Sequence, residues 1–198
     1  MVKNKKYKII LIGASAGGVQ ALRKIIPELP NACPVPVIVV QHLHPQQDEF
    51  HVDFLDQMSK VKVEEALDKT PIETGHVYFA PPNYHLLVEN DKSLGLTVEN
   101  RVSHSIPSID VLFQSAADVY KDSTLAIILT GANADGASGI KYIKELGGTT
   151  IAQNPEEAAT PFMPQAAIST GKVDMVMSLE EIANYLKKLT IGSKEREF

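Results

Sequence analysis

Three short segments of this 198-residue chain carry the residue types that a serine needs to attack an acyl group. The first is Gly13-Ala14-Ser15-Ala16-Gly17, which follows a run of apolar residues. Small residues allow a sharp turn, and the start of a following helix offers unpaired N–H groups that can hold an oxyanion. The same pattern suits a serine N-cap or a loop that cradles a phosphate, so three interpretations of Ser15 stay open.

The second segment is Gln41-His42-Leu43-His44-Pro45, at the end of another apolar run. In a parallel sheet the carboxyl ends of the strands share one edge, which would place His42 near Ser15. A histidine there is suited to act as a general base, although it could also cap a loop. The spacing of His42 and His44 would also suit a metal site, but no second cluster of ligands follows at a suitable spacing.

The third segment, residues 130–136, contains Asp135 between a predicted strand and a predicted helix. An aspartate in that position is often an N-cap. Its alternative role is to orient His42 and to stabilise the imidazolium, and one carboxylate can serve both purposes with its two oxygens. Each of the three residues is a weak signal alone. Their shared position at one edge of one sheet is the stronger indication.

The apolar pattern predicts the elements that would bring these residues together. Short β-branched runs alternate with amphipathic segments of helix length, which is typical of a parallel sheet covered on both faces. We expect sheet strands at 7–12, 35–41, 125–129, 149–152 and 173–177, and helices at 16–29, 48–58, 108–120, 137–145 and 179–189. Segments 76–80, 85–89 and 94–99 predict a small antiparallel insertion. The predicted fold is α/β, doubly wound and mostly parallel, with helices on both faces and a small antiparallel hairpin insertion.

The composition excludes several classes of protein. The chain has 19 basic and 24 acidic side chains and a net charge of -5, which argues against a general nucleic-acid binder. Its single cysteine, Cys33, excludes an intramolecular disulfide and a cysteine-based metal site. No stretch approaches the roughly 18 apolar residues of a membrane helix, so we expect no membrane insertion and a cytoplasmic location.

The motifs in their order resemble the catalytic domain of the CheB-type protein-glutamate methylesterases. The resemblance covers nearly the whole chain and includes Ile12–Gly18, Val39–His42, Gly75–Pro82, Pro107–Phe113, Leu129–Gly139, Gly147–Gln153, Met163–Ala167, Gly171–Val176 and Leu179–Ile182. Several of these forms look most like family members that are fused or paired with receptor methyltransferases. Many ordered motifs at compatible spacing make the resemblance far more specific than one glycine-rich loop.

The resemblance implies a serine hydrolase that removes γ-methyl esters from glutamates of chemoreceptor-type proteins, and in many members deamidates glutamine. Ser15 matches the nucleophile, His42 the base and Asp135 the acid that orients it. The resemblance further implies oxyanion donors or site walls at Ala16, Gly17, Ala132, Asn133 and Met163. No cofactor and no metal are implied.

The implied partners are the methylated cytoplasmic helices of chemoreceptors, with a receptor methyltransferase or a separate response regulator as further candidates. We expect one domain over residues 1–189 and a charged, frayed tail over 190–198. The chain begins at the first catalytic strand, so we expect no receiver domain and no regulation by phosphorylation in cis.

Two departures from the family pattern bear on activity. Gly131-Ala132-Asn133 replaces Gly-Met-Gly or Gly-x-Gly, and asparagine adopts a positive φ less freely than glycine. Phe162 stands where a glycine often precedes the Met-Pro pair. The changed loop, together with the expected lack of a receiver domain, keeps open an alternative function as a catalytically weak module that docks on a receptor or a methyltransferase. Tyr84 and His85, near the predicted hairpin, are expected at the surface.

Overall fold

The computed structural model describes residues 7–31, 33–42, 52–98 and 105–191. Its centre is a parallel sheet with the strand order β3-β4-β2-β1-β7-β8-β9. The strands are β1 (Ile9–Ala14), β2 (Val37–Gln41), β3 (Lys62–Glu65), β4 (His76–Phe79), β7 (Thr124–Ile128), β8 (Thr149–Gln153) and β9 (Met175–Met177). Separately, β5 (His85–Val88) and β6 (Leu94–Thr97) form an antiparallel hairpin.

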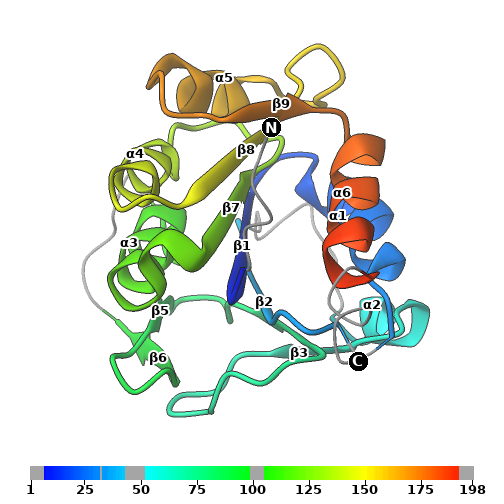
Figure 1. The fold of residues 1–198 in the computed structure, drawn as a ribbon, viewed down its shortest axis with the longest axis vertical. Coiled ribbons are helices and arrows are strands. Elements are labelled where there is room, and N and C mark those ends of the chain that lie inside the picture. Colours follow the sequence, from blue (N-terminus) through cyan, green and yellow to red (C-terminus); the bar gives the residue numbers. More distant parts are fainter. Residues whose placement is uncertain (1–6, 32, 43–51, 99–104, 192–198) are drawn as a thin grey trace, which may run out of the picture.

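Helices cover both faces of the sheet (Figure 1). One face packs against α1 (Gly18–Ile25) with its 3-10 extension Ile26–Glu28, against α2 (Val52–Met58) and against α6 (Leu179–Ile191). The other face packs against α3 (Ile109–Tyr120), α4 (Ala137–Glu145) and α5 (Phe162–Ser169). A 3-10 turn, Lys121–Ser123, joins α3 to β7.

The central strands are apolar along their whole length because both of their faces are covered. In β1, Ile10 and Ile12 point into the core under α1 and α6, while Ile9 and Leu11 point into the core under α3 and α4. All six residues of β1 are buried. This two-sided burial explains why the sequence shows continuous apolar runs rather than alternation.

The predicted fold class is confirmed, with three corrections to the elements. The segment 76–80 was expected in the antiparallel insertion, but β4 pairs in parallel with β2 and β3 in the main sheet. The edge strand β3 and the helix α5 were not expected from the sequence. Among the described residues, the antiparallel pairing consists of the β5–β6 hairpin and one isolated bridge between Pro71 and Ser93. The hairpin shares a core cluster with α3 through Leu86, Val88 and Leu94.

The strand order places three loops side by side at the carboxyl edge of the sheet. Strand β1 lies between β2 and β7, and Ala14 is in register with Gln41, while Gly13 is in register with Ile128. The residues that follow these three strands therefore meet at one edge, where α/β proteins usually bind their ligands.

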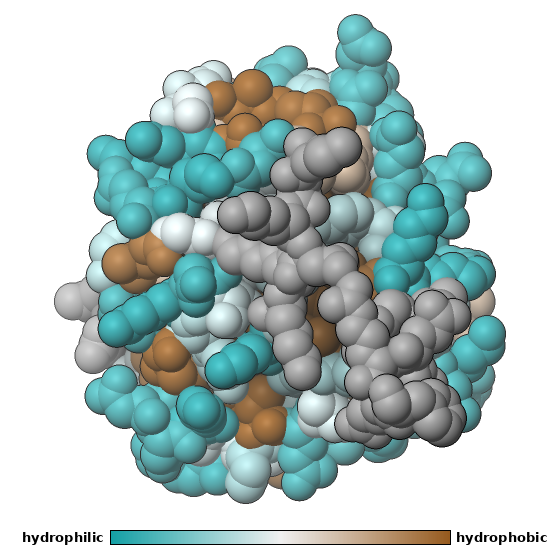
Figure 2. All heavy atoms as spheres, in the orientation of Figure 1, coloured by the Kyte–Doolittle hydropathy of each residue, from teal (hydrophilic) through white to brown (hydrophobic). Residues whose placement is uncertain are grey.

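Figure 2 shows mostly hydrophilic side chains on the visible face, with apolar surface confined to separate areas, one of them over α5 and β9.

Candidate active site

Ser15 lies in a tight turn between β1 and α1. Its carbonyl oxygen accepts a hydrogen bond from Gly18 N at 2.7 Å, and its N–H donates to Thr130 O at 2.9 Å. The N-cap of α1 is Gly17, whose φ of 80° lies in the left-handed region that favours glycine. The N-cap interpretation of Ser15 is therefore wrong, and the serine side chain remains free for another role.

Met163 and Gly131 lie close to the candidate nucleophile. A Cβ atom on Gly131 would lie 2.6 Å from Met163 Sδ and 2.9 Å from Ser15 Cβ, so all three residues share one small volume. Met163 is buried, and its N–H donates to Gly131 O at 2.9 Å. Met163 thus lies beside Ser15, as a residue of a site wall must.

The side chain of Gln41 joins the backbone of Ser15 to the backbone of His42. Its Nε2 donates to Ser15 O at 2.9 Å and to His42 O at 2.7 Å, while His42 N donates to Ala14 O at 2.9 Å. Gln41 is 4% exposed. Gln41 is not among the site residues expected from the sequence, although a polar residue at the end of an apolar strand was a usable signal.

Asp135 holds the imidazole of His42. Its carboxylate is fully buried, and Oδ2 lies 2.9 Å from His42 Nε2 and accepts from Ile109 N at 2.7 Å. Oδ1 accepts from Ser108 Oγ at 2.9 Å and from Asp110 N at 3.1 Å. Asp135 does not cap α4, whose N-cap is Gly136; it receives the N–H groups at the start of α3 instead.

These hydrogen bonds decide the charge of Asp135. Burial by itself would raise the pKa of this carboxyl, but the hydrogen bonds from His42 and from Ile109 N outweigh burial and hold the pKa below its ordinary value. An ionised carboxylate can only accept, so the shared proton lies on His42 Nε2. In the neutral ring the lone pair is then on Nδ1, which is the atom able to take a proton from Ser15.

The loop after β7 brings a second polar group to His42. Asn133 Oδ1 accepts from Asp135 N at 3.1 Å, and Asn133 Nδ2 lies 3.4 Å from His42 Nδ1. The described non-glycine residues with positive φ do not include Asn133. The expected difficulty with asparagine in place of glycine therefore does not arise, because the loop needs no left-handed residue at this position.

Two backbone N–H groups are available at the site. Ala16 and Ala132 are both exposed, and neither N–H donates a hydrogen bond to another residue in the described part of the chain. The Ser15 hydroxyl likewise has no hydrogen-bond partner among those residues. Nucleophile and base are often loosely aligned before a substrate binds, and free donors beside the nucleophile suit an oxyanion.

One residue near the site departs from expectation. His85 was expected at the surface, but it is 1% exposed and its Nδ1 accepts from Ser108 N at 3.1 Å, directly behind Asp135. Tyr84 is exposed as expected. Phe162 is 54% exposed and so does not fill the site in place of the missing glycine. His44 lies outside the described residues, among which no cluster of three or more metal-binding side chains occurs.

Comparison with known proteins shows the family of this chain. The family model of the CheB methylesterase matches residues 10–186. This chain belongs to the CheB methylesterase family. A protein of Leptospira interrogans is 45% identical over 190 residues, which are 96% of this chain and 98% of the relative. The crystal structure of the Thermotoga maritima CheB methylesterase catalytic domain superposes with a TM-score of 0.87 at 36% identity, covering 93% of this chain and 99% of that one.

Many CheB relatives are longer than this chain. The protein-glutamate methylesterase/protein-glutamine glutaminase of Clostridium acetobutylicum is 36% identical over 191 residues, which are 96% of this chain but 55% of the relative. The chain thus spans about half the length of such relatives. In the described part of this CheB domain, no helix has both the length and the apolar character to cross a membrane.

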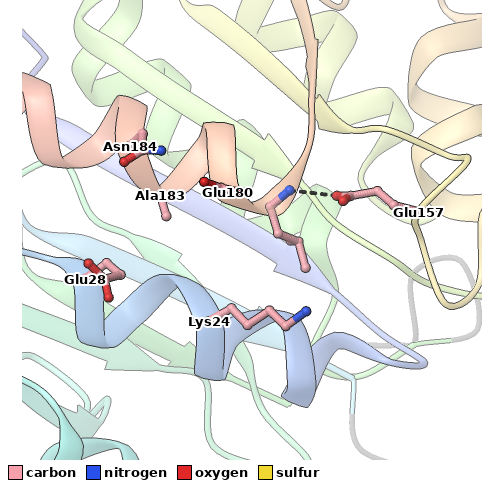
Figure 3. Close-up of a pocket in the computed structure, with 7 residues that line it drawn as sticks. Lys24, Glu28, Glu157, Glu180, Ala183 and Asn184 are labelled. Carbon is pink, nitrogen blue, oxygen red and sulfur yellow. Dashed lines mark hydrogen bonds between the residues drawn. The ribbon is translucent and has the colours of Figure 1, made fainter.

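A groove between α1 and α6 shares no residue with the CheB site. It is lined by Lys24, Glu28, Glu157, Leu179, Glu180, Ala183 and Asn184 (Figure 3). Glu157 is engaged at its rim, because Oε1 accepts from Leu179 N at 2.6 Å. The groove is acidic, and its lining contains no serine, cysteine or histidine.

Proposed function

We propose that Ser15, His42 and Asp135 form a catalytic triad that hydrolyses γ-methyl esters of glutamate in chemoreceptor-type proteins. The observation that carries the proposal is the buried bond between Asp135 Oδ2 and His42 Nε2. This bond leaves Nδ1 as the acceptor nitrogen of the ring, at the sheet edge where the Ser15 turn lies, with Asn133 Nδ2 3.4 Å from it. Membership in the CheB methylesterase family supplies the reaction class.

The reaction follows from the positions of these groups. His42 Nδ1 takes the proton of Ser15 Oγ as that oxygen attacks the ester carbonyl. The N–H groups of Ala16 and Ala132, with those of Gly17 and Asn133 beside them, would stabilise the oxyanion. His42 then returns the proton to the methoxy oxygen, methanol leaves, and water clears the acyl-enzyme by the same proton route. Met163 would shape the wall beside the acyl group.

The substrate and partners belong to the same proposal. Methylated cytoplasmic helices of a chemoreceptor are the substrate, which places the reaction in the cytoplasm. The Clostridium acetobutylicum relative is also named as a glutaminase, so glutamine at the same receptor sites is a second substrate to test. A receptor methyltransferase or a separate response regulator is the proposed regulatory partner.

A purely docking function has no support in the site. The changed loop at Gly131-Ala132-Asn133 keeps Ala132 N free and leaves the bond between His42 and Asp135 intact. A module that had lost catalysis would have no need for an ionised, fully buried carboxylate behind its histidine.

The test is methanol release from a methylated cytoplasmic fragment of a chemoreceptor, with wild type and Ser15→Ala measured side by side. Mass spectrometry of the same samples identifies the glutamates that lose a methyl group. We expect release by wild type and a loss of at least about a thousandfold in the variant. Equal release by both proteins would refute the assignment of Ser15.

A further inference from the structure

The side chain of Asn133 has a fixed orientation at the base of the proposed triad. Asp135 N can only donate, so the Asn133 atom that it contacts at 3.1 Å must be the carbonyl oxygen Oδ1. The amide nitrogen Nδ2 therefore points the other way, toward His42 Nδ1 at 3.4 Å and Ser105 Oγ at 3.5 Å. Asn133 thus presents N–H donors, and no acceptor, to the imidazole.

The nitrogen that Asn133 approaches is the one that exchanges the proton. His42 Nε2 is committed to the Asp135 carboxylate, so proton transfer to and from substrate passes through Nδ1. A leaving atom must come within hydrogen-bond distance of Nδ1 to receive that proton. Nδ1 has one lone-pair direction, so the leaving atom and Asn133 Nδ2 approach the same side of the ring and become neighbours.

We propose that Asn133 selects methyl esters over glutamine side chains by donating a hydrogen bond to the departing oxygen; this inference rests on the proposed function. In the tetrahedral intermediate of the ester, the bond from carbon to the methoxy oxygen breaks and that oxygen takes the proton from His42 Nδ1. A methoxy oxygen has two lone pairs, so one accepts the proton and the other accepts from Asn133 Nδ2.

The amide reaction cannot use the same donor. When the bond from carbon to nitrogen breaks, the departing NH2 group has one lone pair, and the proton from His42 occupies it as ammonia forms. The hydrogens of the departing nitrogen then face the N–H donors of Asn133. Both routes leave the same acyl-enzyme on Ser15, which water hydrolyses to glutamate, so the two substrates differ only in this first half-reaction.

The test compares two substrates on the same protein. One is a chemoreceptor cytoplasmic fragment with methyl-esterified glutamates, followed by methanol release. The other is the same fragment with glutamine at those positions, followed by ammonia release. Wild type is compared with Asn133→Ala, which removes the amide, and with Asn133→Asp, which keeps an acceptor for Asp135 N but removes the donor.

We expect both variants to lose about tenfold in kcat/KM for methanol release, the effect of one hydrogen bond, without a matching loss in ammonia release. If wild type releases no ammonia, the supporting result is the same methanol loss together with new ammonia release by Asn133→Asp. If wild type releases ammonia, equal losses on both substrates would overturn the proposal; if it does not, methanol loss without new ammonia release by Asn133→Asp would overturn it. In either case, full recovery of methanol release in Asn133→Asp would indicate that Asn133 only holds the loop.

Controls separate this inference from the proposed function. Asn154 also accepts from a main-chain N–H two residues ahead, Glu156 N at 3.1 Å, so Asn154→Ala removes a similar turn contact outside the site and should leave both rates unchanged. Ser15→Ala in the same assay tests the proposed function. Suppose that wild type releases methanol and Ser15→Ala does not. An unchanged ratio of methanol release to ammonia release in the Asn133 variants then overturns the proposed selectivity alone. If wild type releases nothing, both proposals fail.

Discussion

His42 Nε2 lies 2.9 Å from Asp135 Oδ2, and the same oxygen accepts the N–H of Ile109 at the first turn of α3. The proposed base is therefore oriented by a carboxylate that is itself hydrogen-bonded to the start of a helix. Positive charge at a helix N-terminus favours the ionised form of that carboxylate. The position of the His42 ring thus depends on the packing of α3 as well as on the strand that precedes it.

Asp135→Asn is expected to lower kcat by about a thousandfold or more, as with other triads in which the orienting acid is replaced by its amide. The amide can donate to His42 Nε2 and so favours the tautomer with its proton on Nδ1, where it blocks proton transfer from Ser15. Methanol release at saturating substrate measures the effect. Asp174→Asn, which changes a carboxylate that accepts from Thr150 N near β9, is the control; an equal loss in that variant would contradict the account.

Asp110 gives the stability of the domain a distinct pH dependence. Burial raises the pKa of Asp110 to about 6; the N–H of Gly139 opposes this effect and the charge of Asp135 adds to it. Between about pH 4 and pH 6 the folded protein keeps a proton that the unfolded chain has released, so this group lowers the free energy of unfolding as pH rises through that window. The change is on the order of 3 kcal/mol.

Asp110→Asn should remove this contribution. Relative to wild type, the variant should gain stability from pH 4.5 to pH 7, which urea unfolding at several pH values measures. Asp118→Asn serves as the control on the same helix, because the Asp118 side chain is exposed and, among the described residues, accepts a hydrogen bond only from Tyr142 OH. A difference between wild type and Asp110→Asn that does not change with pH would show that Asp110 does not titrate in this range.

Gln41 is expected to hold nucleophile and base at their working separation. Gln41→Leu removes both N–H donors, so His42 O loses its bond from Gln41 and Ser15 O keeps only Gly18 N, which should cost about 1–3 kcal/mol of stability. A misplacement of the Ser15 turn by an ångström should lower kcat/KM about a hundredfold. Gln41→Glu keeps the shape of the side chain but places a carboxylate oxygen next to the carbonyl oxygens of Ser15 and His42, so it should not recover activity. Recovery would show that side-chain volume matters and that hydrogen-bond donation does not.

Thr124→Val is the matched control for Gln41→Leu. Thr124 is buried at the start of β7, and its hydroxyl has no hydrogen-bond partner among the described residues. Removing that hydroxyl should leave stability and methanol release unchanged within about 0.5 kcal/mol. A large loss in Thr124→Val would mean that any polar replacement in the sheet disturbs the site.

Gly131→Ala tests whether Ser15 has room to move. The added methyl group would lie 2.6 Å from Met163 Cε and Sδ and 2.9 Å from Ser15 Cβ, so we expect a stability loss of about 1–3 kcal/mol and strongly reduced methanol release. Met163→Ala in the same chain relieves the first contact only. The double variant should regain stability without regaining activity, and recovery of both would show that Ser15 is not displaced.

The elements around the site could be predicted because each begins or ends at a strong local signal. The apolar run of β1 stops at small residues, and α3 begins at Ser108, whose hydroxyl accepts from Val111 N as an N-cap. Asp135 and His42 were assigned to one sheet edge because parallel strands share their carboxyl ends. That placement needs only parallel strands, which the alternation of strands and helices indicates.

The elements that sequence analysis missed have patterns set by tertiary contacts. Strand β3 has one buried residue, Val63, because it lies at the sheet edge, so its sequence resembles a polar loop. Without β3 on its outer side, β4 looked like one arm of a hairpin. His85 looked exposed because histidine usually is, yet its Nδ1 is required by Ser108 N, a contact between residues 23 positions apart.

The central claim is that Ser15 and His42 act as one unit, and a double-mutant cycle on methanol release tests it most directly. The four proteins are wild type, Ser15→Ala, His42→Ala and the double variant, assayed on the same methylated receptor fragment. We predict that each single change removes nearly all activity and that the double variant loses no more than either single variant. Methanol release by Ser15→Ala at the wild-type rate would contradict the account. So would a loss in the double variant equal to the product of the two single losses.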